Sequence, residues 1–311
     1  MNTSENPVVP EKNGTPGQVL FSGVATALIT PFTENGAAID FPALEKLIAY
    51  QCDGGADALI VAGTTGEAST LSEEEYLSLL RYTVEAVGHR VPVIAGCGSN
   101  DTARAVAHAR TAAGAECDAL LAVTPYYNKA TADGLYRHFC AIADATPLPL
   151  LLYNVPGRTG CDLTPKVVGR LCAHPRIAGI KEASGSILRI AELLEAYGDR
   201  LAVYSGCDEL YLPTLSLSGS GVISVVSNLL PTQMHALFST FRAGQTTEAA
   251  SMQLALLPLI RALFAEVNPI PVKTALSLMG FCRPDCRLPL CTASPQVRRD
   301  LKTRLAAYGL C

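Results

Sequence analysis

Lys181 is the residue of this sequence best placed to act as a nucleophile. It lies in the apolar run Ile-Ala-Gly-Ile-Lys-Glu-Ala-Ser of residues 177–184. Burial strips water from an ammonium group and favours the neutral amine, which can attack a carbonyl carbon. The other lysines lie in a polar tail, a loop or stretches of helical pattern: Lys12, Lys46, Lys129, Lys166, Lys273 and Lys302. The position predicts a Schiff-base lysine, against the plainer alternative of a strand-end lysine that reaches solvent.

A loop of small polar residues follows the second apolar run of the chain. Thr64 and Thr65 lie in the sequence Gly-Thr-Thr-Gly-Glu, where two glycines permit a tight turn and backbone amides and hydroxyls converge. Such a loop can bind a carboxylate with neutral donors, although Gly and Thr are equally typical of an ordinary turn with a helix cap. We expect it to bind the carboxylate of a keto acid.

Tyrosines and an arginine follow the next apolar runs. Tyr127 lies in Thr-Pro-Tyr-Tyr-Asn, and Tyr153 and Arg158 lie in Tyr-Asn-Val-Pro-Gly-Arg-Thr-Gly. Tyrosine hydroxyls can relay protons and arginine can bind a carboxylate bidentately, although tyrosine pairs are often packing residues. These residues predict an imine between Lys181 and a keto acid, proton transfer by tyrosine to give an enamine, and an anionic electrophile oriented by Arg158.

Two further positions complete the expected site. Gly206 follows the seventh apolar run and Ile223 lies in the eighth. A small and an apolar side chain there would let a substrate approach the lysine. Imine chemistry of this kind needs neither a metal nor a cofactor.

Eight short apolar runs alternate with longer amphipathic stretches, which is typical of β/α units on a parallel sheet. The predicted strands are residues 23–29, 57–62, 92–95, 119–123, 149–153, 177–181, 202–205 and 221–224. Predicted helices include residues 41–52, 72–87, 101–113, 132–145, 187–196, 246–264, 270–279 and 295–307. Eight units favour an α/β fold, a (β/α)8 TIM barrel with a C-terminal helical extension. An open doubly wound sheet fits less well, because no Gly-x-Gly-x-x-Gly turn follows the first strand.

The chain divides into three predicted parts. Residues 1–20 are rich in Asn, Pro, Gly, Ser, Thr and Glu and predict a disordered tail. Residues 21–245 form the barrel, and residues 246–311 form a helical region that packs on it or serves assembly. The stretch 210–241 lacks charges, but prolines and glycines interrupt it, so we expect a helix, a strand and another helix of a soluble core.

The composition argues against several kinds of partner. A net charge of −4 gives no reason to expect nucleic acid or an anionic membrane. The 11 cysteines form no paired framework and no secretory signal is recognisable, so we expect reduced thiols and a cytoplasmic location. Cys282, Cys286 and Cys291 lie close together, but no histidine is near and the spacing fits no common zinc site, so no metal is expected.

Five motifs occur in the order and spacing of one known family. They are Gly-Thr-Thr-Gly-Glu at 63–67, Pro-Tyr-Tyr-Asn at 125–128, Tyr-Asn-Val-Pro-x-Arg-Thr-Gly at 153–160, Gly-Ile-Lys-Glu at 179–182 and Asn-Pro-Ile-Pro-Val-Lys at 268–273. Over residues 21–307 the chain resembles the dihydrodipicolinate synthase family, which lies in the superfamily of pyruvate-dependent class I aldolases and N-acetylneuraminate lyase. The arginine in the third motif is the discriminating feature, because sialic acid lyases lack it.

The resemblance implies condensation of pyruvate with L-aspartate 4-semialdehyde to 4-hydroxy-tetrahydrodipicolinate, in lysine and diaminopimelate biosynthesis. In the family, the counterpart of Lys181 carries the imine, and that of Tyr153 shuttles protons through Thr65. Tyr127 completes this chain from the neighbouring subunit, so the usual homotetramer of two tight dimers is part of catalysis. The counterpart of Arg158 binds the carboxylate of the semialdehyde.

Lysine inhibits some bacterial members by binding at the dimer interface, and this chain departs from their pattern. It has Glu73 and Tyr76 where histidines are common, and Arg104 in place of a glutamate that pairs with the ammonium groups of lysine. Asn100 and Tyr126 match. The resemblance therefore implies weak or absent inhibition by lysine.

Two other functions stay open at this point. Another aldolase of the superfamily could apply the same imine chemistry to a sugar acid or a hydroxyproline-derived keto acid, because a fold does not fix the second substrate. A barrel that binds a keto acid without catalysis would need a broken set of catalytic residues, and none is broken here.

Overall fold

The computed structural model describes residues 19–311, in which eight parallel strands close into one barrel. They are β1 (Gly23–Ala27), β2 (Ala58–Val61), β3 (Val93–Gly96), β4 (Ala119–Val123), β5 (Leu150–Asn154), β6 (Ile177–Glu182), β7 (Ala202–Ser205) and β8 (Gly221–Ser224). Neighbours around the barrel are neighbours in sequence, and β8 pairs with β1. The predicted (β/α)8 barrel is confirmed. The predicted tail, residues 1–20, lies outside the described part except for its last two residues.

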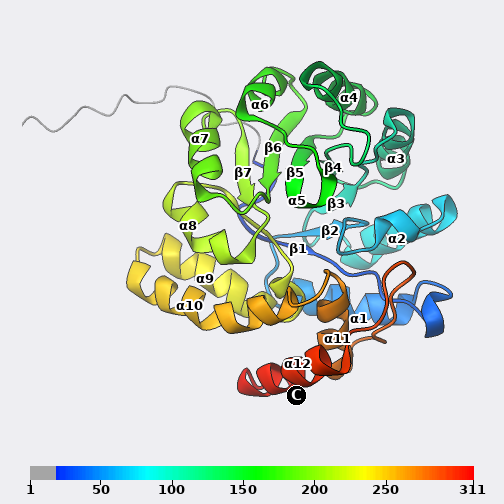
Figure 1. Ribbon diagram of the computed structural model, residues 1–311, viewed down its shortest axis with the longest axis vertical. Coiled ribbons are helices and arrows are strands. Elements are labelled where there is room, and N and C mark those ends of the chain that lie inside the picture. Colours follow the sequence, from blue (N-terminus) through cyan, green and yellow to red (C-terminus); the bar gives the residue numbers. More distant parts are fainter. Residues whose placement is uncertain (1–18) are drawn as a thin grey trace, which may run out of the picture.

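Helices surround the barrel in Figure 1. They are α1 (Phe41–Asp53), α2 (Glu73–Val87), α3 (Thr102–Gly114), α4 (Ala132–Asp144), α5 (Pro156–Thr159), α6 (Pro165–Leu171), α7 (Ile187–Tyr197), α8 (Tyr211–Ser216) and α9 (Pro231–Arg242). Several begin at a side chain that accepts a backbone N–H, and Ser72 and Glu75 form a complete capping box on α2. The uncharged stretch forms α8, β8 and α9 as predicted. Within residues 19–311, no helix is long and apolar enough to cross a membrane.

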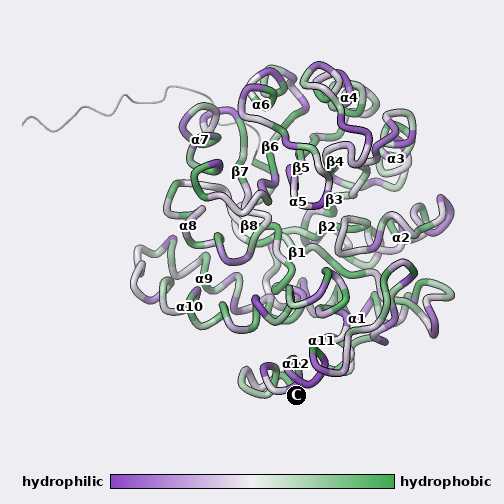
Figure 2. Tube along the Cα trace, in the orientation of Figure 1, coloured by the Kyte–Doolittle hydropathy of each residue, from purple (hydrophilic) through white to green (hydrophobic). Residues whose placement is uncertain are grey.

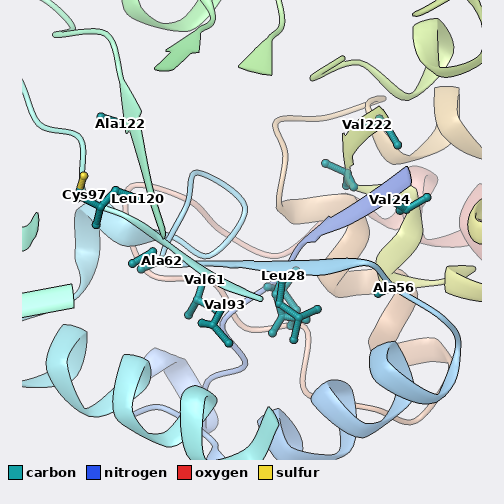
Figure 3. Packing of buried hydrophobic residues seen from close by; sticks show 14 of the residues in the cluster. Val24, Leu28, Ala56, Val61, Ala62, Val93, Cys97, Leu120, Ala122 and Val222 are labelled. Atoms are coloured by element: carbon teal, nitrogen blue, oxygen red, sulfur yellow. The ribbon is translucent and has the colours of Figure 1, made fainter. Parts of the chain in front are cut away.

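The strands are buried on both faces, which explains their apolar composition. One cluster fills the barrel interior, with Ile60, Leu121 and Tyr204 among its members. A second, larger cluster lies between strands and helices, and Figure 3 shows Leu28, Val61 and other members of it. The strands are correspondingly hydrophobic along most of their length in Figure 2. A charged side chain inside such a barrel is therefore exceptional.

The C-terminal extension packs against the barrel helices. It consists of α10 (Thr246–Leu263), α11 (Ile270–Leu278) and α12 (Pro295–Ala307). Helix α10 contacts α8 and α9, and α12 contacts α10 and α11 (Figure 1). The segments before α11 and before α12 reach the rim of the barrel, where Asn268 and Leu290 contribute to the site described next.

Candidate active site

Lys181 is buried inside the barrel near the C-terminal end of β6. Its side chain is 6% exposed. It is paired in register with Tyr153 on β5 and with Tyr204 on β7, so the three side chains point to the same face of the sheet. The Nζ atom of Lys181 lies 4.3 Å from the centre of the Tyr153 ring. The structure therefore places the predicted nucleophile directly against the predicted proton carrier.

The carboxylate next to the lysine in sequence is turned away from it. Glu182 and Lys181 point to opposite faces because they are successive residues of one strand. Asn154 Nδ2 donates to Glu182 Oε2 at 2.9 Å, and the Ser184 amide donates to Oε1 at 2.7 Å. These bonds hold Glu182 away from the amine of Lys181. They also link the ends of β5 and β6, which carry Tyr153 and Lys181.

The end of β7 leaves room for the lysine. A Cβ atom on Gly206 would lie 2.9 Å from Cε of Lys181 and 2.6 Å from Cβ of Ala183, so the lysine conformation requires glycine there. At the next residue, burial raises the pKa of the Cys207 thiol to about 11. This thiol is therefore neutral at neutral pH and places no negative charge near the lysine.

A cavity of about 370 Å³ opens at the C-terminal ends of the strands. Its wall includes Thr64 after β2, Tyr126 after β4, Tyr153 and Arg158 from β5 and α5, and Asn268 before α11. Lys181 is not itself part of this wall, but it packs against the Tyr153 ring, which is. Such a rim of strand ends is where (β/α)8 enzymes carry out their chemistry.

Thr65 lies just behind this wall and is 3% exposed. Its Oγ1 atom accepts a hydrogen bond from Asn268 Nδ2 at 2.9 Å. Arg158 Nη2 donates to the main-chain oxygen of the same Asn268 at 3.2 Å. One asparagine of the C-terminal extension thus connects the predicted carboxylate loop with the predicted arginine. It was not predicted as a site residue, although it begins the fifth sequence motif.

Tyr127 lies apart from this group, and Ile223 lies behind the cavity wall in the interior cluster that also contains Tyr153. Tyr127 is 88% exposed and does not line the cavity. Its φ of 74° places it in the left-handed region, which bulky residues seldom adopt. Ile223 is fully buried in the interior cluster with Tyr204 and likewise does not line the cavity. One chain alone therefore assembles Lys181, Tyr153, the threonine loop and Arg158 without Tyr127.

Lys273 lies in a helix, α11, as predicted, but its side chain does not face solvent. It is fully buried, and its Nζ atom lies 2.6 Å from Glu67 Oε1. The backbone N–H of Arg287 donates to Glu67 Oε2 at 2.9 Å. The C-terminal extension thus fixes Glu67, which ends the Gly-Thr-Thr-Gly-Glu loop at a φ of 54°. The apolar neighbours of Lys273 were the available sequence signal, the same one that singled out Lys181.

The outer end of the cavity carries a charged cluster at the positions that depart from the family pattern. Glu73 pairs with Arg104 Nη2 at 3.2 Å and with His108 Nε2 at 3.0 Å. The His108 ring stacks on Tyr76, with ring centres 4.5 Å apart, and the Tyr76 hydroxyl donates to the Gly96 oxygen. Glu73 is therefore paired with Arg104 and hydrogen-bonded to His108 within its own chain.

No metal site was found in the described part of the chain. Residues 19–311 contain no group of three or more His, Cys, Asp or Glu side chains that could hold a metal ion. The cysteines of the chain are all free, including Cys282, Cys286 and Cys291. Burial raises the pKa of the Cys282 and Cys286 thiols to about 12, which disfavours the thiolate form that binds zinc.

Comparison with known proteins gives one consistent result. A model of the dihydrodipicolinate synthetase family matches residues 20–308. The 4-hydroxy-tetrahydrodipicolinate synthase of Acetivibrio thermocellus is 48% identical over 94% of this chain and 98% of its own. The structure of dihydrodipicolinate synthase from Thermotoga maritima aligns with a TM-score of 0.91 and 42% identity, covering 94% of this chain and all of that one (100%). The enzyme from Cyanidioschyzon merolae, solved with lysine bound, aligns with a TM-score of 0.90 and 41% identity over 94% and 99% of the two chains.

Proposed function

This chain belongs to the dihydrodipicolinate synthetase family, and from this we propose how its residues condense pyruvate with L-aspartate 4-semialdehyde. The activity is that of a 4-hydroxy-tetrahydrodipicolinate synthase, a lyase of lysine and diaminopimelate biosynthesis. The assignment of residues rests on one observation. Lys181 is buried against the Tyr153 ring, beside a cavity whose wall includes Arg158.

The chemistry begins with attack of the neutral Lys181 amine on the keto carbon of pyruvate. Loss of water gives an imine, which draws electrons from the neighbouring methyl group, so no cofactor is required. The loop of Thr64 and Thr65 binds the pyruvate carboxylate. Tyr153, which lies against Lys181, moves the protons that form the imine and then the enamine. Gly206 and Ile223 keep this end of the barrel small and apolar.

The second substrate enters from the mouth of the cavity. Arg158 binds the carboxylate of the semialdehyde and presents its aldehyde carbon to the enamine. We infer that Thr65 relays protons between Tyr153 and Tyr127 of a neighbouring subunit, which requires at least a dimer and fits the homotetramer of two tight dimers that the family resemblance implies. The barrel of residues 21–245 and the helical region of residues 246–311 form one catalytic unit. The free cysteines support a cytoplasmic location.

The assay that tests this function measures both substrates together. With pyruvate and aspartate 4-semialdehyde, the protein should consume the two in equal amounts. The matched reaction offers keto-deoxy sugar acids for cleavage, which a sugar-acid aldolase of the same superfamily would accept. Faster cleavage of a sugar acid than condensation with the semialdehyde would contradict the proposal. Absence of both reactions would leave only a non-catalytic barrel.

Changing Tyr127 to Phe should lower activity strongly, and mixing this variant with Lys181→Ala protein should partly restore it. A mixed dimer has one site with Lys181 from one chain and Tyr127 from the other. The exposed position of Tyr127 in the single chain supports this arrangement. The measurement is condensation activity after verified subunit exchange.

A matched mixture controls the Tyr127 experiment. Tyr153→Phe mixed with Lys181→Ala should recover nothing, because Tyr153 and Lys181 are register partners within one chain. Equal recovery in both mixtures would show that recovery does not report a shared site, because Tyr153 and Lys181 belong to the same chain. No recovery with Tyr127→Phe would assign Tyr127 to its own subunit or to no site.

Lysine should inhibit this enzyme weakly or not at all. Arg104 places a positive charge where the ammonium groups of lysine would bind, and Glu73 can offset it only in part, because Glu73 is already paired with Arg104 and contacts His108. A like-charge penalty of about 1–2 kcal/mol weakens binding roughly tenfold. Steady-state inhibition is the measurement, and Arg104→Glu should increase sensitivity while Arg110→Glu on the same helix should not. Sub-millimolar inhibition of the unaltered enzyme would contradict the argument.

A further inference from the structure

Asn268 carries a buried oxygen for which the described chain provides no partner. Its side chain is 5% exposed, and its Oδ1 atom accepts no hydrogen bond within residues 19–311. Buried carbonyl oxygens without a donor are rare and costly, so each one calls for an explanation. Three other buried side-chain atoms share this state, on His138, Asp208 and Tyr211, but those residues do not line the active-site cavity. Asn268 does.

The other polar groups of Asn268 are bound to residues of the proposed mechanism. Its Nδ2 atom donates to Thr65 Oγ1 at 2.9 Å, and its main-chain oxygen accepts from Arg158 Nη2 at 3.2 Å. With the amide nitrogen engaged by Thr65, the amide oxygen is the atom left for a ligand. That ligand has to be a hydrogen-bond donor, because an amide oxygen only accepts.

The second substrate carries such a donor next to its carboxylate. Aspartate 4-semialdehyde has an ammonium and a carboxylate on the same carbon, so the groups that bind them must be neighbours. Arg158 and Asn268 are in contact. Among residues 19–311, Glu67 is the single carboxylate on the cavity wall, and it is already held at 2.6 Å by Lys273 and at 2.9 Å by the Arg287 amide. Asn268 Oδ1 is thus a buried acceptor without a partner, on a residue whose main-chain oxygen contacts Arg158.

We propose that Asn268 Oδ1 accepts a hydrogen bond from the α-ammonium group of the semialdehyde. Asn268 then selects a semialdehyde that bears an α-amino group over one that lacks it. This inference rests on the proposed function, in which Arg158 binds the carboxylate of the same molecule. It adds a residue that determines specificity to the residues that carry out the chemistry.

The test compares two ligands that differ only in the amino group. The KM of aspartate 4-semialdehyde is measured together with the Ki of succinate semialdehyde as its competitor, a constant that is defined whether or not the competitor is turned over. In Asn268→Ala, the KM should rise roughly tenfold or more, the effect of losing a hydrogen bond to a charged group. The Ki should change little. A parallel change in both constants, or in neither, would overturn the proposal.

A second variant keeps the test decisive if Asn268→Ala folds poorly. Asn268→Asp retains an acceptor for the ammonium group but loses the N–H group that donates a hydrogen bond to Thr65 Oγ1. It should preserve the preference for the amino-bearing ligand while kcat falls. Two outcomes would contradict the proposal. One is that Asn268→Asp loses the preference for the amino-bearing ligand, and the other is that Asn268→Ala keeps it.

Arg158→Ala separates this inference from the function on which it rests. Both ligands carry the carboxylate, so Arg158→Ala should weaken both about equally, and borohydride trapping of pyruvate should continue in all three variants. If Arg158→Ala leaves both constants unchanged, the proposed placement of the semialdehyde carboxylate is wrong. If Arg158→Ala weakens the binding of both ligands while Asn268→Ala changes the KM and the Ki in parallel, or changes neither, the function stands and the role of Asn268 falls.

Discussion

Replacing Lys181 with alanine is expected to abolish turnover while the protein stays folded. Without the amine no imine forms, and the enamine route is closed. Removing a residue that forms a covalent intermediate lowers kcat by a factor on the order of 10⁴–10⁶. Lys181→Arg should be equally inactive, because a guanidinium stays protonated and cannot attack a carbonyl. The measurement is the condensation assay, with thermal unfolding to show that each variant is folded.

Borohydride trapping gives the direct readout for the same variants. Incubation of the unaltered protein with pyruvate and borohydride should leave a reduced adduct on the peptide that contains Lys181, found by mass spectrometry. Lys166→Ala is the matched control, because that lysine is exposed on α6, and it should keep both the adduct and the activity. An adduct on Lys181→Ala protein would show that another amine forms the imine and would refute the assignment.

Replacing Lys273 with methionine is expected to lower the free energy of unfolding strongly. The substitution leaves Glu67 buried and without its ammonium partner, which lies 2.6 Å away in the unaltered protein. Breaking one side of a buried ion pair costs about 3–5 kcal/mol. Activity should also fall, because Glu67 ends the loop that carries Thr64 and Thr65. Denaturant unfolding of the variant and the parent protein measures the change.

Two further variants identify the cause of that loss. Arg170→Met removes an exposed pair with Asp133 of nearly the same length, 2.7 Å, and should leave stability almost unchanged because water solvates the freed carboxylate. Glu67→Gln combined with Lys273→Met should recover part of the loss, since no charge is then left buried. If Lys273→Met lowers the free energy of unfolding no more than Arg170→Met does, the Lys273–Glu67 pair does not anchor the loop.

The barrel, and a lysine buried within one of its strands, could be predicted from the sequence alone. The strands are buried on both faces, so they appear as apolar runs, and a lysine within one of them is conspicuous. Most observed strand ends fall within a residue or two of those predicted, because glycine, proline and capping residues mark where each run ends. The residues around Lys181 and Arg158 keep a fixed local spacing, which made the resemblance recognisable.

The tertiary structure alone decided which distant residues complete the site. Asn268 is 203 positions from Thr65, and Arg287 is 220 positions from Glu67, yet each forms a hydrogen bond across that separation. The position of Lys181 against Tyr153 follows from the register of β5 and β6. Local patterns report whether a residue is buried, through the periodicity of apolar side chains. They do not report which partner it meets, because that depends on how the closed barrel and the C-terminal extension bring separate segments together.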